Sequence, residues 1–209
     1  MKTHLIHVKG RRIGRNAVEQ TVTALAAGGV VIFPTDTVYG IAASVFRPQA
    51  IRRIYRLKGR SYKKPFPFLV ANVEQALALV EPPSKKLRHL LDKYWPGPLT
   101  VVFNTSALGR WTTGGKDTLA LRIPAHPVTQ AILKEMGHPL AVTSANRSGQ
   151  AEAVTGKEAE GLFAGKVDVL VDAGPCPGGV PSTVINVAST HWTLVREGAI
   201  KKKELLRFL

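Results

Sequence analysis

Short apolar segments alternate with segments of helical periodicity along most of this chain of 209 residues. Apolar runs of about four to eight residues, bounded by Pro, Gly or polar residues, are typical of strands, whereas apolar residues at every third or fourth position are typical of helices. The predicted strands cover residues 30–33, 66–71, 99–103, 118–123, 140–143, 167–171, 184–187 and 193–196. The predicted helices lie between Asn16 and Gly28, after Pro48, near 73–80 and 84–93, from Pro127 to about Met136, and in a basic segment at the C-terminus. This alternation favours an α/β fold.

The last predicted strands follow one another without a helix between them. Parallel neighbours need a crossover connection, so this arrangement predicts a mixed sheet rather than a purely parallel one. No internal repeat or linker divides the sequence, and we therefore expect a single domain over residues 1–209.

Three polar residues predict where helices begin. Asn16 is expected to be an N-cap, and Glu19 stands three residues later, where it would complete a capping box. Ser84 is expected to open the helix at 84–93, and His126 precedes Pro127 as an N-cap or a packed residue rather than a metal ligand.

The composition indicates a globular protein. Hydrophobic residues make up 44% of the chain, and the mean hydropathy is +0.02. No apolar stretch reaches the roughly 18 residues that a membrane span needs, and the N-terminus lacks the apolar run of a signal peptide. The single cysteine, Cys176, cannot form an internal disulfide, which favours a cytoplasmic location, and its Pro- and Gly-rich surroundings argue against a nucleophile.

Basic residues outnumber acidic ones, and the formal net charge is +15. Between Thr37 and Val73 there is no Asp or Glu, yet eight Lys and Arg side chains are present. Such a one-sided segment suggests that an anion such as phosphate or RNA supplies the missing negative charge. A solvated basic helix face, or a contribution to solubility, would explain the same charge.

Polar residues gather directly after several predicted strands, where α/β sheets bind their ligands. The segment Pro34–Gly40 brings two hydroxyls and a carboxylate to the end of one strand, although Thr or Asp there would also cap the following segment. Small polar residues follow another strand at 143–149, and a hydroxyl-bearing loop precedes a strand at 178–183. Each of these signals is weak alone.

Three cations stand at the ends of predicted elements. Lys58 and Arg60 follow a helix, where they could bind phosphate oxygens or satisfy the last carbonyl groups of that helix. Arg122 ends an apolar strand and needs an anionic partner, either a substrate carboxylate or a structural Asp.

Several motifs of other enzyme classes are absent from the sequence. There is no P-loop, no Gly-x-Gly-x-x-Gly fingerprint, no pair of histidines with metal-ligand spacing and no serine nucleophile elbow. An enzyme built on this sequence would therefore bind and orient anions through Lys, Arg and hydroxyl groups instead of forming a covalent intermediate.

Six segments together resemble the YrdC-like family of threonylcarbamoyl-AMP synthases. They are Pro-Thr-Asp-Thr-Val-Tyr-Gly (34–40), Lys-Gly-Arg (58–60), Trp-Pro-Gly-Pro-Leu-Thr (95–100), Leu-Ala-Leu-Arg-Ile-Pro-Ala-His-Pro (119–127), Thr-Ser-Ala-Asn-Arg-Ser-Gly (143–149) and Pro-Ser-Thr-Val-Ile (181–185). They occur in the order and spacing of the family and cover a core of about residues 15–200, with a basic tail at 201–209.

The resemblance implies a YrdC-like fold, in which a twisted, open, mixed sheet is flanked by helices around a large basic cavity. It also implies an L-threonylcarbamoyladenylate synthase, which joins L-threonine, bicarbonate or CO2, and ATP with release of pyrophosphate. The product serves the t6A modification at adenosine 37 of tRNA, through a downstream threonylcarbamoyl transferase complex. Mg²⁺ would be bound through the phosphates of ATP and water.

Site residues follow from the same resemblance. Lys58, Arg60, Ser144 and Asn146 are implied as catalytic and ATP-binding residues. Thr118 and Arg196 are implied to face the nucleotide. Thr35, Arg122 and Ser182 are implied to hold L-threonine, with Arg122 on its carboxylate.

The sequence also departs from the family pattern. Longer members carry a second domain after a linker, and we expect none in a chain that ends at Leu209. Some members place a His in the strand after Lys-x-Arg, whereas residues 66–70 here contain none, and Ser61 stands where Pro is frequent.

Two other functions remain open at this level. The first is a binding module for double-stranded RNA or tRNA, which the charge favours. The second is a carbamoyl-transfer enzyme, because related domains occur in such proteins.

Overall fold

A ten-stranded mixed sheet with eight helices forms the part of the chain that the computed structural model describes, residues 2–10 and 12–208. The strands are β1 (His4–His7), β2 (Val31–Phe33), β3 (Gly40–Ser44), β4 (Phe68–Leu69), β5 (Leu99–Asn104), β6 (Thr118–Arg122), β7 (Leu140–Ser144), β8 (Val169–Asp172), β9 (Thr183–Asn186) and β10 (Thr193–Arg196). The helices are α1 (Arg15–Ala26), α2 (Pro48–Lys58), α3 (Val73–Ala78), α4 (Lys85–Tyr94), α5 (Ala107–Thr112), α6 (Pro127–Met136), α7 (Gly156–Phe163) and α8 (Lys202–Leu205).

The strand order is β1-β8-β2-β3-β7-β4-β6-β5-β9-β10. Parallel pairs, such as β1 with β8 and β5 with β9, occur beside antiparallel pairs, such as β3 with β7 and β5 with β6. The predicted mixed α/β sheet is therefore confirmed.

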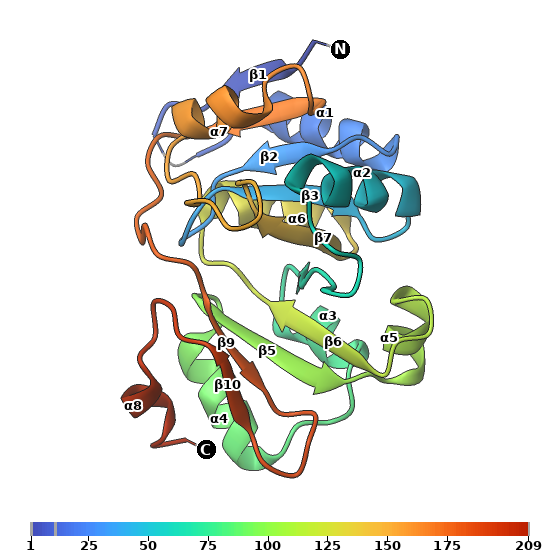
Figure 1. Cartoon of the computed structure of the whole chain (residues 1–209), viewed down its shortest axis with the longest axis vertical. Coiled ribbons are helices and arrows are strands. Elements are labelled where there is room, and N and C mark those ends of the chain that lie inside the picture. Colours follow the sequence, from blue (N-terminus) through green and yellow to red (C-terminus); the bar gives the residue numbers. More distant parts are fainter. Residues whose placement is uncertain (1, 11, 209) are drawn as a thin grey trace.

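The sheet narrows at its middle. Residues 66–71 were predicted to form one strand, but only Phe68 and Leu69 pair, with β6 on one side and β7 on the other. Pro67 cannot donate a backbone hydrogen bond, which prevents a longer ladder. Beyond this strand, the N–H of Ala71 donates to the side chain of Gln75 (2.9 Å). Figure 1 shows an upper group of strands that includes β2, β3 and β7 and a lower group that includes β5, β6, β9 and β10. Strand β4 joins the two groups, because it pairs with β7 of the upper group and β6 of the lower group.

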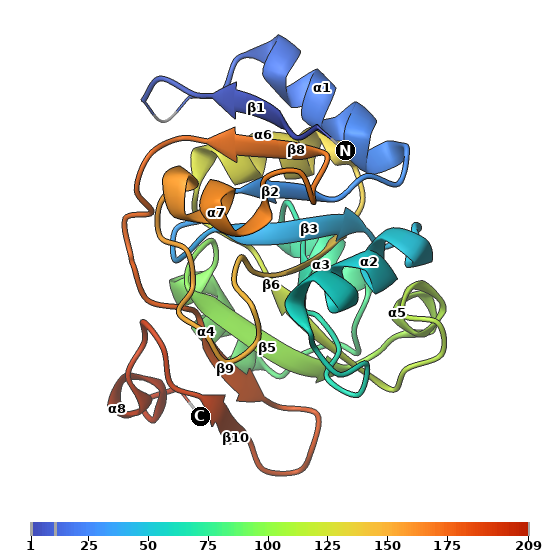
Figure 2. The same ribbon diagram turned by 45° about the horizontal axis from the view of Figure 1, so that its top comes forward.

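Alternate residues of β2 enter two different cores. Val31 and Phe33 pack with α1 and α6, whereas Ile32 packs in the larger cluster that includes Ile54 of α2 and Phe163 of α7. Figure 2 shows the corresponding layers, with α1 and α6 on one face of the upper strands and α2 and α7 on the other.

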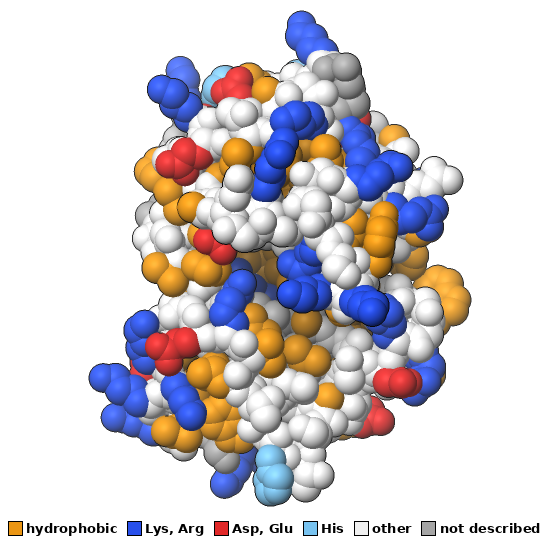
Figure 3. Space-filling view, in the orientation of Figure 1, with side chains coloured by type: hydrophobic (Ala, Val, Ile, Leu, Met, Phe, Trp, Pro, Cys, Tyr) orange, Lys and Arg blue, Asp and Glu red, His pale blue; other side chains and the backbone are white. Residues whose placement is uncertain are grey.

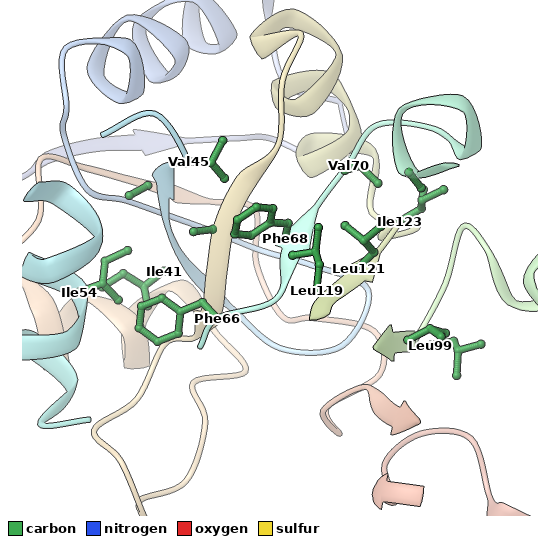
Figure 4. Close-up of a cluster of buried hydrophobic side chains, with 14 of the residues drawn as sticks. Ile41, Val45, Ile54, Phe66, Phe68, Val70, Leu99, Leu119, Leu121 and Ile123 are labelled. Carbon is green, nitrogen blue, oxygen red and sulfur yellow. The ribbon is translucent and has the colours of Figure 1, made fainter. Parts of the chain in front are cut away.

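The larger core continues through the narrow middle of the sheet. Figure 4 shows Ile41 of β3, Ile54 of α2, Phe68 of β4 and Leu119 and Leu121 of β6 in one buried cluster. Each of these side chains is at most 8% exposed. The two groups of strands therefore share one hydrophobic core, even though few backbone hydrogen bonds join them.

The predicted start of the first helix is wrong: the helix begins two residues earlier than an N-cap at Asn16 would place it, and its cap is a different residue. Helix α1 begins at Arg15 after Gly14, and no side chain caps it. The carboxylate of Glu19 accepts a hydrogen bond from Arg15 Nε (2.8 Å) instead of closing a capping box, and Asn16 lies within the helix. The caps at Ser84 and His126 are confirmed, because each side chain accepts a hydrogen bond from a backbone N–H of its helix.

Candidate active site

Lys58 is the most enclosed of the predicted site cations. It is the last residue of α2 and is 3% exposed. Gly59 follows with a φ of 61°, a left-handed conformation that ends the helix and turns the chain toward Arg60. Lys58 Nζ donates to the carbonyl oxygens of Ser144 (2.5 Å) and Asn146 (2.8 Å) and to Asn146 Oδ1 (2.7 Å). An ammonium group has three protons, so every one of them is used.

Hydrogen bonds inside the loop fix the segment Ser144–Asn146, in addition to those from Lys58. Ser144 Oγ donates to Asn146 Oδ1 (2.8 Å), and Asn146 Nδ2 donates to the carbonyl of Gln150 (2.6 Å). The N–H of Ser148 also donates to the carbonyl of Lys58 (2.9 Å). The structure therefore brings three of the four predicted catalytic residues, Lys58, Ser144 and Asn146, into one hydrogen-bonded cluster.

Arg60 lies beside this cluster on the loop that leaves α2. Its Nε donates to the carbonyl of Lys64 (3.1 Å), and its guanidinium lies over the ring of Phe66, 5.2 Å from the ring centre. The side chains of Lys58 and Arg60 bond no carbonyl of α2 in the described hydrogen bonds, whereas the backbone N–H of Arg60 donates to the carbonyl of Tyr55 (3.0 Å) in the turn that ends the helix. The alternative in which these two side chains satisfy the last carbonyl groups of the helix therefore does not fit their contacts.

Arg122 is paired with a structural carboxylate. Its Nη2 donates to Asp36 Oδ1 (2.7 Å), its Nη1 to Thr37 Oγ1 (2.9 Å) and its Nε to the carbonyl of Gly97 (2.9 Å). Thr35 Oγ1 lies 2.9 Å from Thr37 Oγ1. The predicted threonine-binding residues Arg122 and Thr35 are thus linked through Thr37, whose role the sequence did not single out.

Ser182 and Arg196 are in direct contact, although the resemblance gave them different ligands. Arg196 Nη2 donates to the carbonyl of Ser182 (2.8 Å) and to its Oγ (3.2 Å). Ser182 Oγ also lies 2.9 Å from Thr100 Oγ1, on β5. Thr100 ends one of the six motifs and could have been noticed there.

Electrostatic effects connect the cations. Burial and, to a smaller extent, the charge of Arg60 lower the pKa of Lys58 to about 8, against an opposing effect of Glu152. Burial lowers the pKa of Arg196, and the charge of Glu152 opposes this shift while that of Arg60 adds to it. Burial also lowers the pKa of Arg122, Asp36 opposes that shift, and the charge of Arg196 adds to it. Glu152 was missed by the sequence analysis, because no motif contains it.

Thr118 lies at the opposite end of β6 from Arg122. It is exposed at the start of β6, whereas Arg122 ends the same strand about 13 Å away at the usual rise per residue. Thr118 lines a pocket between α2 and α5 instead.

Basic side chains gather around the middle of the face shown in Figure 3, where the surface is hollowed between the two groups of strands. The helices of the described residues include none that is long and apolar enough to cross a membrane. A group of three or more His, Cys, Asp or Glu side chains able to hold a metal ion is also absent from residues 2–10 and 12–208.

The fold and these contacts define a class of protein: an α/β protein with a mixed sheet, in which cations and hydroxyl groups meet at strand ends and could bind an anionic substrate. The family follows from comparison with known proteins. The family model for Sua5, YciO and YrdC, described as "Telomere recombination", matches residues 23–198, and the chain belongs to this family.

Curated relatives include the threonylcarbamoyl-AMP synthases of Bacillus subtilis and Pyrococcus abyssi. They are 35% and 34% identical to this chain over 90% and 91% of its length. The chain spans only 55% and 58% of these two relatives.

A crystal structure of Pyrococcus abyssi Sua5 complexed with L-threonine has the same fold, with a TM-score of 0.91 and 33% identity. The match covers 99% of this chain and 61% of the Sua5 chain. The twisted, open sheet predicted from the resemblance is therefore confirmed.

Proposed function

We propose that this chain is an L-threonylcarbamoyladenylate synthase, a nucleotidyltransferase that acts on L-threonine, bicarbonate or CO2, and ATP. The observation that carries the proposal is the cluster in which Lys58 bonds the segment Ser144–Asn146, with Arg60 and Arg196 close enough to act on one another electrostatically. The names of the curated relatives support the same activity.

The reaction has two bond-forming steps. The amine nitrogen of threonine attacks the carbon of CO2 and loses a proton, which gives a carbamate. A carbamate oxygen then attacks the α-phosphorus of ATP, the bond from that phosphorus to the β-phosphate oxygen breaks, and pyrophosphate leaves. Negative charge builds on the phosphate oxygens, so fixed cations and precise positioning supply most of the catalysis.

We assign the phosphate contacts to Arg60 and Arg196 and to the remaining N–H of Asn146 Nδ2, because the hydroxyl proton of Ser144 is used in its hydrogen bond to Asn146. The three protons of Lys58 are used inside the protein, so its part is to fix the position of Ser144 and Asn146. This assignment modifies the role that the resemblance gave to Lys58.

We assign the threonine carboxylate to Arg122. A guanidinium has five N–H groups, and the hydrogen bonds to Asp36, Thr37 and Gly97 use three, which leaves one on each Nη atom. Thr35 and Ser182 would complete the threonine site.

Mg²⁺ fits this site as an ion carried by the triphosphate. Few carboxylates are needed, because Mg²⁺ keeps several waters and binds substrate phosphates. The wider setting that we propose is cytoplasmic, with the adenylate passed to a threonylcarbamoyl transferase complex that modifies tRNA.

The test is to incubate the protein with ATP, Mg²⁺ and bicarbonate, with and without L-threonine, and to measure pyrophosphate. We expect release that depends on both threonine and bicarbonate and needs no RNA. Turnover with carbamoyl phosphate in the absence of threonine would instead identify a carbamoyl-transfer enzyme. No threonine-dependent release from folded protein would refute the proposal.

A further inference from the structure

A second pocket opens between α2 and α5, on the right-hand edge of the molecule in Figure 1. Its volume is about 470 Å3, within the range of roughly 300–1,000 Å3 that is usual for ligand pockets. Among the described residues that line it, Thr118 alone belongs to the predicted site. This pocket is thus a separate feature that borders the candidate active site.

Aromatic side chains form two sides of the pocket. Phe46 and Trp111 lie with their ring centres 5.8 Å apart, and Tyr55 and Tyr62 lie 4.6 Å apart. Trp111 is 69% exposed, Tyr62 57% and Phe46 46%. Large aromatic groups left in water at one place indicate a binding surface, and their faces suit a flat, apolar ligand.

The pocket also carries positive charge. Arg52 and Lys116 are exposed and line it, and its described lining includes no Asp or Glu. Lys63 and Lys64 are exposed on the same loop as Tyr62. In Figure 3, hydrophobic and basic side chains lie together at this edge. The ligand that fits such a lining has a flat ring and a negative charge.

We propose that this pocket binds an unpaired base of a single-stranded RNA segment. The base stacks on the exposed aromatic rings, and the neighbouring phosphates contact Arg52 and Lys116. Aromatic platforms bordered by cations are the usual means of binding single strands, whereas the bases of a duplex stay stacked on one another. The residues assigned to the phosphates, Arg60, Asn146 and Arg196, are not among the residues that line the pocket, which favours an RNA strand over ATP as its occupant.

Fluorescence anisotropy with a labelled single-stranded RNA of about 12 nucleotides tests this proposal. Trp111→Ala and Tyr62→Ala should each weaken binding at least about fivefold, because one stacked base is lost. Leu108→Ala is the matched control, since Leu108 is exposed on the same helix α5 but lies outside the pocket. It should change binding less than about twofold. Circular dichroism checks that each variant is folded, and the conservative Trp111→Phe should retain most of the affinity.

A charge comparison completes the test. Arg52→Gln should reduce the salt dependence of binding by about one phosphate contact. Lys157→Gln, an equal charge change at an exposed residue of α7, should not. Synthesis of the adenylate should be unchanged in Trp111→Ala, so this result is independent of the proposed function.

Three results would overturn the proposal. Equal effects of Trp111→Ala and Leu108→Ala would exclude the pocket as the binding site. If ATP displaced the RNA from the parent protein but not from Trp111→Ala, the pocket would bind the adenine of ATP instead. If the binding of a double-stranded RNA were weakened by Trp111→Ala as much as that of the single strand, no unpaired base would be needed.

Discussion

Lys58 and Asn146 are the pair of residues on which the geometry of the site depends most directly. Asn146 Oδ1 accepts hydrogen bonds from both Lys58 Nζ (2.7 Å) and Ser144 Oγ (2.8 Å). Lys58 is buried, and its charge is satisfied only by this segment in the described hydrogen bonds. A change at either residue therefore disturbs the other.

This contact predicts that the effects of Lys58→Ala and Asn146→Ala are not additive. Each single variant should lower the rate of adenylate formation at least tenfold, which corresponds to about 1.4 kcal/mol of barrier. The double variant should be little slower than the worse single one, because both remove the same interaction. Steady-state rates of the four proteins measure the coupling between the two substitutions. Lys157→Ala is the control, because it removes the same charge as Lys58→Ala. Fully additive effects would show that the two residues act separately.

The pKa of Lys58 predicts a loss of activity in alkaline solution. Burial lowers this pKa to about 8, so the ammonium loses a proton as the pH rises through that value. One of the three hydrogen bonds is then lost, and the segment Ser144–Asn146 loosens. Lys58→Arg should move the alkaline fall in rate to higher pH while lowering the maximal rate, because a guanidinium keeps its charge. A pH–rate profile measures both enzymes under identical substrate conditions. An unchanged alkaline limb would assign it to another group.

At the scale of elements, local sequence signals predicted where two helices begin better than they predicted how long the strands are. Helices after Ser84 and His126 begin where the caps predict. Strand β3 was not predicted, because Gly-Ile-Ala-Ala-Ser has little strand preference of its own and is held by pairing with β2 and β7. Helix α7 was also missed, although the sequence carries its signal.

That signal is the capping box at the start of α7. Thr155 Oγ1 accepts from the N–H of Glu158 (3.2 Å), and Glu158 accepts in return from the N–H of Thr155 (3.1 Å). Thr155→Ala should lower the free energy of unfolding by about 1 kcal/mol, because a backbone donor loses its cap. Urea unfolding measures the change. Thr190→Ala, at an exposed loop position, is the control and should differ from the parent protein by less than about 0.5 kcal/mol. Equal losses would contradict the role of the cap.

At the scale of the whole molecule, two groups of strands are joined by the short strand β4, the shared core and one buried ion pair. Asp36 follows β2 in the upper group, and Arg122 ends β6 in the lower group, 86 positions later in the chain. The sequence predicted that Arg122 needs an anion but could not name Asp36, because only the folded sheet brings the two together. The contacts among Lys58, Ser144 and Asn146, which are far apart in sequence, were anticipated only through the six motifs.

The buried pair predicts a large loss of stability on removal of one charge. Asp36→Asn should lower the free energy of unfolding by about 3 kcal/mol, because Arg122 is left buried without a counter-charge. Asp117→Asn removes one charge from the exposed pair with Arg110 (2.6 Å) and should cost less than about 1 kcal/mol. Chemical denaturation compares the two variants. Equal, small effects would mean that the ion pair does not help to hold the two groups of strands together.

We propose above all that the chain joins the carbon of bicarbonate to threonine and transfers the AMP group of ATP to the resulting carbamate, with release of pyrophosphate. Mass spectrometry of the adenylate formed from L-threonine, ATP and ¹³C-bicarbonate tests it most directly. We predict one adenylate with the mass of threonylcarbamoyl-AMP, increased by one mass unit by the label, and formed only when threonine is present. An unlabelled threonyl adenylate, or no adenylate from folded protein, would contradict the account.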